Sequence, residues 1–87
     1  MYSPAFVEYL GTALLISAVA FATNPLWIPA VLGVAIALGG RISGGHFNPA
    51  VTAYQLFQGK ISQNRALVYI IAQIAAALTV GVARNVL

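Results

Sequence analysis

The sequence predicts an all-α integral membrane protein with three transmembrane helices and one short re-entrant half-helix. Composition is the first reason, since 61% of the 87 residues are hydrophobic and 6% are charged. The mean hydropathy of +0.92 lies outside the range of soluble globular domains. The second reason is that three apolar runs approach the length of about 20 helical residues that crosses a bilayer. The third reason is a polar, glycine-rich segment at residues 42–62, between the second and third runs.

The first run, residues 4–22, starts with signals typical of a helix N-terminus. Ser3 is a suitable cap, and Pro4 fits the first helical position, where a missing N–H costs nothing. Residues 18–20 read Ala-Val-Ala and are compatible with a signal-peptide cleavage site. However, no base precedes the run, and Glu8 stands where such a peptide carries positive charge, so a retained span is favoured.

The second run covers residues 25–41 and follows a turn at Thr23-Asn24-Pro25. Pro29 is predicted to kink this helix or to shift its start. The third run covers residues 63–84, with Ser62 as its cap. Residues 1–87 are therefore predicted to form a single three-span unit. The aromatic residues Tyr2, Trp27 and Phe57 are expected to anchor it at the membrane interfaces.

The segment between the second and third runs is predicted to be re-entrant over residues 42–59. Asn48 is a suitable cap, Pro49 fits the first helical position, and Gly59 is a stop signal. A helix from Pro49 to Gln58 would be about 15 Å long, roughly half the hydrocarbon thickness. Non-helical backbone at that depth must line a cavity or be buried in protein, which indicates a water-filled path. The alternative is a helix lying on the membrane surface, which usually carries several bases, whereas this segment has none before Lys60.

The charged residues exclude several classes of function. Glu8 is the one acid, and four scattered bases form neither a nucleic-acid-binding surface nor a lipid-binding cluster. One acid and one histidine do not readily form a paired acid–base site, so we expect no catalytic residue. The chain has no cysteine and no cluster of metal ligands, so neither a metal site nor another cofactor is expected.

Three ordered motifs carry a resemblance to a known family. Residues 43–52 read Ser-Gly-Gly-His-Phe-Asn-Pro-Ala-Val-Thr and resemble the first signature loop of the aquaporin family, closest to the loop of bacterial water channels. Residues 8–12, Glu-Tyr-Leu-Gly-Thr, are similar to the family's first-span motif, and residues 69–73 are similar to its third-span motif. The family has two tandem halves inserted in opposite directions, and this chain resembles the N-terminal half alone. The resemblance implies a passive channel for water and small neutral solutes.

The pore follows from the resemblance together with the chemistry of the residues. The positive end of the half-helix repels cations, and the Asn48 amide donates to water oxygens, which interrupts the proton-hopping chain as in other aquaporin-type pores. The backbone from Gly44 to Phe47 is expected to be extended and to expose its carbonyls. His46 is expected to line the path as a neutral imidazole or to be satisfied inside the loop. The residues expected to line the pore or set its selectivity are Asn48, Pro49, Ala50, His46, Gly44, Gly45, Phe47, Val51 and Ile28.

Two polar residues inside the spans are expected to brace the loop. Glu8 lies on the side of the membrane from which the loop enters, so it can accept the loop's N–H groups, and a structural role is favoured over a proton relay. Gln73 is expected to brace backbone in the same way or to form an ordinary interhelical hydrogen bond.

The resemblance weakens at the selectivity filter. The family's outer constriction uses an arginine after its second Asn-Pro-Ala, whereas Val51 follows the only such motif here. We expect apolar, less discriminating mouths built from Val51 and residues near Ile28, which leaves the choice among water, glycerol and ammonia open.

A three-span unit cannot enclose a pore, so an inverted homodimer is expected as the minimal channel, in a plasma or inner cell membrane. A different half-chain is the alternative partner, because three of the four bases fall on one side of the membrane and favour a single orientation. A non-conducting scaffold or truncated aquaporin product is a competing interpretation. An ion channel is disfavoured because no ring of charge faces the proposed path.

Overall fold

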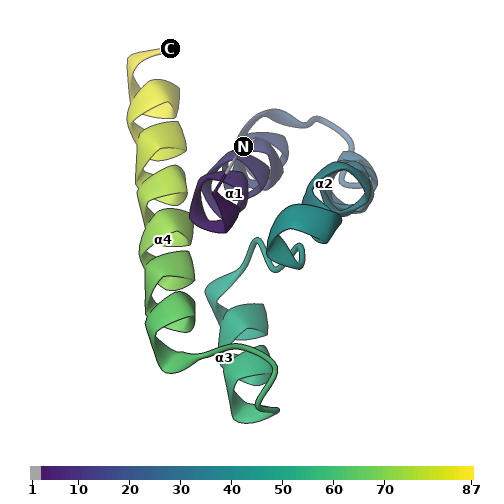
Figure 1. The fold of residues 1–87 in the computed structure, drawn as a ribbon. Coiled ribbons are helices and arrows are strands. Elements are labelled where there is room, and N and C mark those ends of the chain that lie inside the picture. Colours follow the sequence, from purple (N-terminus) through teal and green to yellow (C-terminus); the bar gives the residue numbers. More distant parts are fainter. Residues whose placement is uncertain (1–2) are drawn as a thin grey trace.

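The computed structural model describes residues 3–87, and within this range the regular structure is entirely helical. The predicted all-α class is therefore confirmed. The helices are α1 (Pro4–Phe21), α2 (Trp27–Ser43), α3 (Pro49–Phe57) and α4 (Gln63–Val86), shown in Figure 1. Tyr2, expected as an interface anchor, lies outside the described residues.

Local side-chain hydrogen bonds explain where α1 and α4 begin. The Ser3 hydroxyl accepts the N–H of Phe6 at 3.1 Å, and the Ser62 hydroxyl accepts the N–H of Arg65 at 3.1 Å. Each bond satisfies one of the N–H groups that have no intrahelical partner in a first turn. Both serines are thus the caps that the sequence indicated.

The second helix, α2, starts two residues after the expected Pro25 because Asn24 forms a turn before it. The Oδ1 atom of Asn24 accepts the N–H of Leu26 at 2.9 Å, and its carbonyl accepts the N–H of Trp27 at 3.1 Å. Pro29 falls in the first turn, where a helix needs no N–H, so the helix continues through it. The helix ends at Ser43, where Gly44 takes a left-handed φ of 95°.

Helix α1 is central, since it packs against both α2 and α4, while α3 packs against α4. Figure 1 shows α3 alongside the first part of α4, with the chain reversing between them. The loop of residues 44–48 joins α2 to α3. The signature segment therefore contacts all three long helices on one side, through Glu8 of α1, Ser43 of α2 and Tyr69 and Gln73 of α4.

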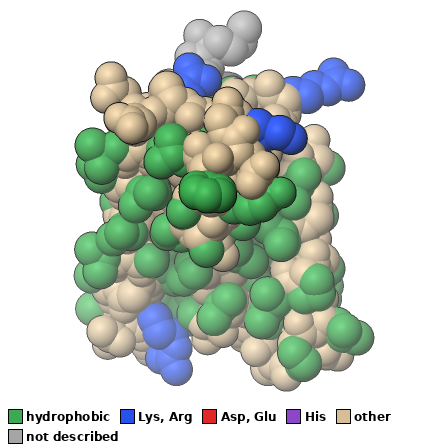
Figure 2. Space-filling view, turned by 90° about the horizontal axis from the view of Figure 1, so that it is seen from below, with side chains coloured by type: hydrophobic (Ala, Val, Ile, Leu, Met, Phe, Trp, Pro, Cys, Tyr) green, Lys and Arg blue, Asp and Glu red, His purple; other side chains and the backbone are tan. Residues whose placement is uncertain are grey.

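The outer surface is apolar, whereas polar side chains lie inside. Leu38, Leu78 and Phe57 are 76%, 66% and 88% exposed, while Glu8 and Thr52 are fully buried. Figure 2 shows Lys and Arg side chains at two opposite ends of one face, with hydrophobic side chains between them. Helices α1 and α4 are long and apolar enough to cross a membrane, and α2 is apolar but shorter, at 17 residues. Such a surface suits lipid or partner helices better than water.

The ring of Phe47 joins the loop to the first two helices. The side chain is 1% exposed, and its backbone φ of 53° is rare outside glycine. A Cβ atom built on Gly11 of α1 would lie 2.1 Å from Cε1 of this ring, and one built on Gly39 of α2 would lie 3.3 Å from its Cζ. The ring therefore occupies the space that the two missing side chains leave.

Replacing Gly11 by alanine should destabilise the protein by about 1–3 kcal/mol, because the new methyl group overlaps the buried Phe47 ring and forces it to shift. The free energy of unfolding in detergent, followed by circular dichroism, measures this. Gly33→Ala is the matched control, since no atom lies within 4 Å of its added Cβ and alanine favours a helix. Equal destabilisation by both substitutions would contradict the proposed packing of Phe47.

Candidate functional site

Three of the five residues in the loop between α2 and α3 have a left-handed backbone conformation. Gly44, Gly45 and Phe47 have φ values of 95°, 67° and 53°. The expectation of extended backbone from Gly44 to Phe47 is therefore wrong. The two glycines adopt these angles without steric cost, and the turning chain points the N–H groups of His46 and Phe47 toward α1.

The carboxylate of Glu8 holds this loop in place. Glu8 is fully buried, and its Oε2 accepts the N–H of His46 at 3.0 Å while its Oε1 accepts the N–H of Phe47 at 2.7 Å. The hydroxyl of Ser43 donates to Oε2 at 2.7 Å, and Nε2 of Gln73 donates to Oε1 at 3.0 Å. Four donors thus surround one carboxylate, as a buried charge requires.

The end of α2 is tied to the same cluster. The hydroxyl of Ser43 also accepts the N–H of Gly45 at 3.1 Å, and the phenol of Tyr69 on α4 donates to the carbonyl of Ser43. Both contacts satisfy backbone groups that the helix end and the turn leave without intrahelical partners.

Gln73 joins Glu8 to α3. Its Nε2 donates to Glu8 and also lies 2.9 Å from Oγ1 of Thr52, so its hydrogen bonds go to side chains of two other helices and not to backbone. Thr52 is fully buried and faces α4, whereas Oε1 of Gln73 is buried without a partner among the described residues. Gln73 and Thr52 therefore connect α1, α3 and α4.

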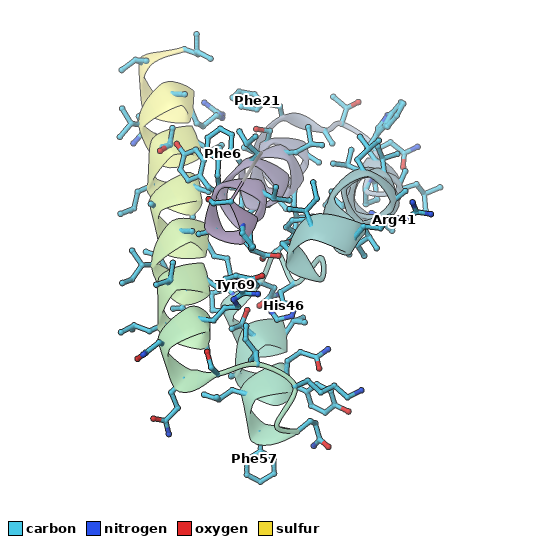
Figure 3. The ribbon with its side chains drawn as sticks, in the orientation of Figure 1. Phe6, Phe21, Arg41, His46, Phe57 and Tyr69 are labelled. Atoms are coloured by element: carbon cyan, nitrogen blue, oxygen red, sulfur yellow. The ribbon has the colours of Figure 1, made fainter. Side chains whose placement is uncertain are left out.

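His46 lies between the loop and α4. Its Nδ1 is 2.9 Å from Oγ1 of Thr52, and its ring meets the ring of Tyr69 edge to face, with centroids 5.1 Å apart. Figure 3 shows His46 and Tyr69 beside each other near the start of α3. The histidine is 8% exposed, so most of its ring is covered by the loop, α3 and α4, and only a small edge faces outward.

The start of α3 is the exposed part of the site. Oδ1 of Asn48 accepts the N–H of Ala50 at 2.7 Å, which leaves the Nδ2 hydrogens without a partner among residues 3–87. Asn48, Pro49, Ala50 and Val51 are all exposed, as is Gly44, whereas Gly45 is half-buried. The arrangement presents amide hydrogens and a helix N-terminus on one open face.

Phe47 and Ile28, both expected at the pore, lie away from the open face at the start of α3 within this chain. The Phe47 ring is buried between α1 and α2, so only its backbone can face a path. Ile28 sits in the first turn of α2, and about 22 Å of helix separates it from the loop at Ser43. Within one chain Ile28 therefore cannot form a mouth together with Val51.

Sequence reasoning did not assign roles to Ser43, Thr52 or Tyr69. Ser43 and Thr52 are the first and last residues of the signature segment, and Tyr69 opens the third-span motif. Each carries a polar group in an otherwise apolar stretch, and such groups need hydrogen-bond partners in lipid. This was the signal by which the sequence could have indicated their role. Among the described residues no group of three His, Cys, Asp or Glu residues could hold a metal ion.

Comparison with known proteins gives a family match over almost the whole chain. The major intrinsic protein family matches residues 5–85. Glycerol uptake facilitator protein-like 6 of Lactiplantibacillus plantarum is 40% identical over 87% of this chain and 39% of its own length. The lens fiber major intrinsic protein of Gallus gallus is 38% identical over 82% of this chain and 32% of its own length. Aquaporin-5 of Sus scrofa is 35% identical over 84% of this chain and 32% of its own length.

The chain thus spans about a third of the length of the curated relatives it matches. No solved structure matches it significantly.

Replacing Glu8 by glutamine should destabilise the protein strongly, by about 1–3 kcal/mol for each donor left unpaired. An amide has one oxygen, so its NH2 group must face donors on one side of the cluster. Thermal unfolding and protease resistance of the loop in detergent measure the effect. Gln63→Ala, at the exposed start of α4, is the control. A Glu8→Gln variant as stable as this control would show that the cluster does not hold the loop.

Proposed function

Because the chain belongs to the major intrinsic protein family, we propose that it forms one half of a membrane channel for water and small neutral solutes. The family consists of integral membrane channels and not of enzymes, and the two long apolar helices agree with that class. The observation that carries the proposal is the start of α3. There an exposed Asn48 amide and a helix N-terminus lie on a loop that buried hydrogen bonds fix in place.

The proposed topology has three spans and one re-entrant half-helix. Helix α4 has 24 residues and is about 36 Å long, enough to cross the hydrocarbon core of about 30 Å. Helix α3 has nine residues and is about 14 Å long, so it reaches about half that depth beside the first part of α4. This length supports a position of Asn48 near the middle of the membrane.

The start of α3 supplies the proposed selectivity against ions. A helix N-terminus carries about half a positive charge, which repels cations and hydronium where water is scarce. The Asn48 side chain accepts from Ala50 with its oxygen, so its NH2 group is directed away from the helix and can donate to a water oxygen. A water held by such donors on both sides cannot accept a further proton along the chain.

A second, inverted copy of the chain is the proposed opposite wall. The face of α3 that carries Val51 and Tyr54 is exposed, at 38% and 60%, and α3 packs against α4 alone. An inverted copy would place its own α3 start against this one, so that two Asn48 amides meet. The pair also brings Val51 of one copy toward the start of the partner's α2, where Ile28 lies, which a single chain does not do.

The mouths of this proposed pair are apolar. Val51 is an exposed aliphatic residue in the first turn of α3, and α3 contains no charged residue. Apolar mouths without an arginine admit solutes larger than water, and a name among the relatives, glycerol uptake facilitator, is compatible with this width. We propose a cell membrane, plasma or inner, as the location.

Liposomes that contain the purified protein should shrink faster in a sucrose gradient than empty liposomes do. Asn48→Asp keeps the helix cap, since Asp caps as well as Asn, but it replaces the free amide hydrogens with a charge. We expect a several-fold loss of water flux, measured by light scattering. Asn64→Asp, the same change at an exposed position of α4, is the control. Flux equal to that of empty liposomes would refute the channel and favour a non-conducting scaffold.

The same liposomes should re-swell in glycerol, because the apolar mouths lack the arginine that narrows the family's filter. Val51→Arg should lower glycerol flux more than water flux, since the new side chain narrows the opening and adds charge. The ratio of the two rates is the measurement. Strong exclusion of glycerol by the unmodified protein would contradict the wide mouth.

An inverted homodimer requires both orientations in one membrane. Tags at the two termini should therefore each be accessible from both sides of cells that produce the 87-residue chain. Accessibility of each tag from one side alone would exclude the inverted homodimer and would indicate a different half-unit as the partner.

A further inference from the structure

The polar cluster behind the loop determines where its hydrogen atoms lie. A carboxylate only accepts hydrogen bonds, so Gln73 must turn its NH2 group, and not its oxygen, toward Glu8. The same nitrogen lies 2.9 Å from Oγ1 of Thr52, so the hydroxyl oxygen accepts from it. The single hydrogen of Thr52 must therefore point to another acceptor.

Only one acceptor for that hydrogen is found among residues 3–87. Ser17 and Thr79 donate to the carbonyl four residues earlier in their helices, but Thr52 makes no such bond. Thr52 is fully buried, so no solvent is available to it. The remaining neighbour is Nδ1 of His46 at 2.9 Å, which must accept the hydrogen and so carries none itself.

A neutral imidazole whose Nδ1 accepts carries its hydrogen on Nε2. Nε2 of His46 has no hydrogen-bond partner among the described residues. It is also not buried, so it lies at the surface of the unit. It lies beside Gly44, where an added Cβ would stand 3.3 Å from it. The free N–H is thus two residues before Asn48, on the open side of the loop.

We propose that Thr52 is a positioning residue that holds His46 as the Nε2–H tautomer, with Gln73 fixing the direction of the Thr52 hydroxyl. The ring then offers a fixed donor to solutes that have an acceptor oxygen, such as water and small alcohols, next to the amide of Asn48. The role toward solutes rests on the proposed channel, whereas the tautomer depends only on the hydrogen bonds of the cluster.

Nuclear magnetic resonance of the ¹⁵N-histidine-labelled protein in lipid bilayers tests the tautomer directly. His46 is the one histidine of the chain, so its signals need no assignment. At mildly alkaline pH the unmodified protein should show one form, with Nδ1 unprotonated and Nε2 protonated. A protonated Nδ1, or a mixture of both forms, would overturn the proposal without any variant.

Two variants test the part played by Thr52. Thr52→Val keeps the shape but removes the donor, so both tautomers should appear, whereas Thr52→Ser restores the hydroxyl and should restore the single form. A single Nε2–H form in Thr52→Val would show that Thr52 does not set the tautomer.

Liposome flux separates this inference from the proposed channel. If the unmodified chain conducts, Thr52→Val should conduct several-fold less water than Thr52→Ser, and equal flux would refute the role toward solutes. If no variant conducts, the channel fails, and the resonance spectra still decide the tautomer.

Discussion

The pairing of backbone N–H groups with the buried carboxylate of Glu8 is the contact on which the loop depends. Backbone that leaves a helix inside an apolar environment exposes donors that water cannot satisfy there. Glu8 satisfies two of them, at His46 and Phe47, and two side chains complete its coordination. The acid lies one turn inside α1, so one residue connects the first helix to a segment nearly forty residues later in the chain.

Local sequence signals explain a large part of the fold. The caps Ser3 and Ser62 and the pair Asn48-Pro49 predicted the helix starts, because capping and proline geometry act within a few residues. The sequence also predicted that Glu8 accepts N–H groups of the loop. The start of α2 differed because the Asn24 turn takes up two more residues than the proline position suggests.

Long-range contacts had no such signal. The left-handed conformations of Gly44, Gly45 and Phe47 turn the N–H groups of the loop toward Glu8. No pattern of neighbouring residues in the sequence predicts this contact. The place of the Phe47 ring depends on two glycines from different helices, and the contacts of Thr52 depend on a glutamine 21 residues later. Residue types showed which polar groups need partners, but only three-dimensional packing identifies those partners.

The ring of Phe47 between Gly11 and Gly39 limits how the molecule can change shape. Shifting the loop sideways would pull the ring out from between these two glycines and would leave its space unfilled, which costs packing energy. The position of the loop is therefore coupled to the packing of α1 against α2. A rearrangement of the loop therefore has to be accompanied by a change in how α1 packs against α2, or by a movement of the ring into the apolar cavity beside it.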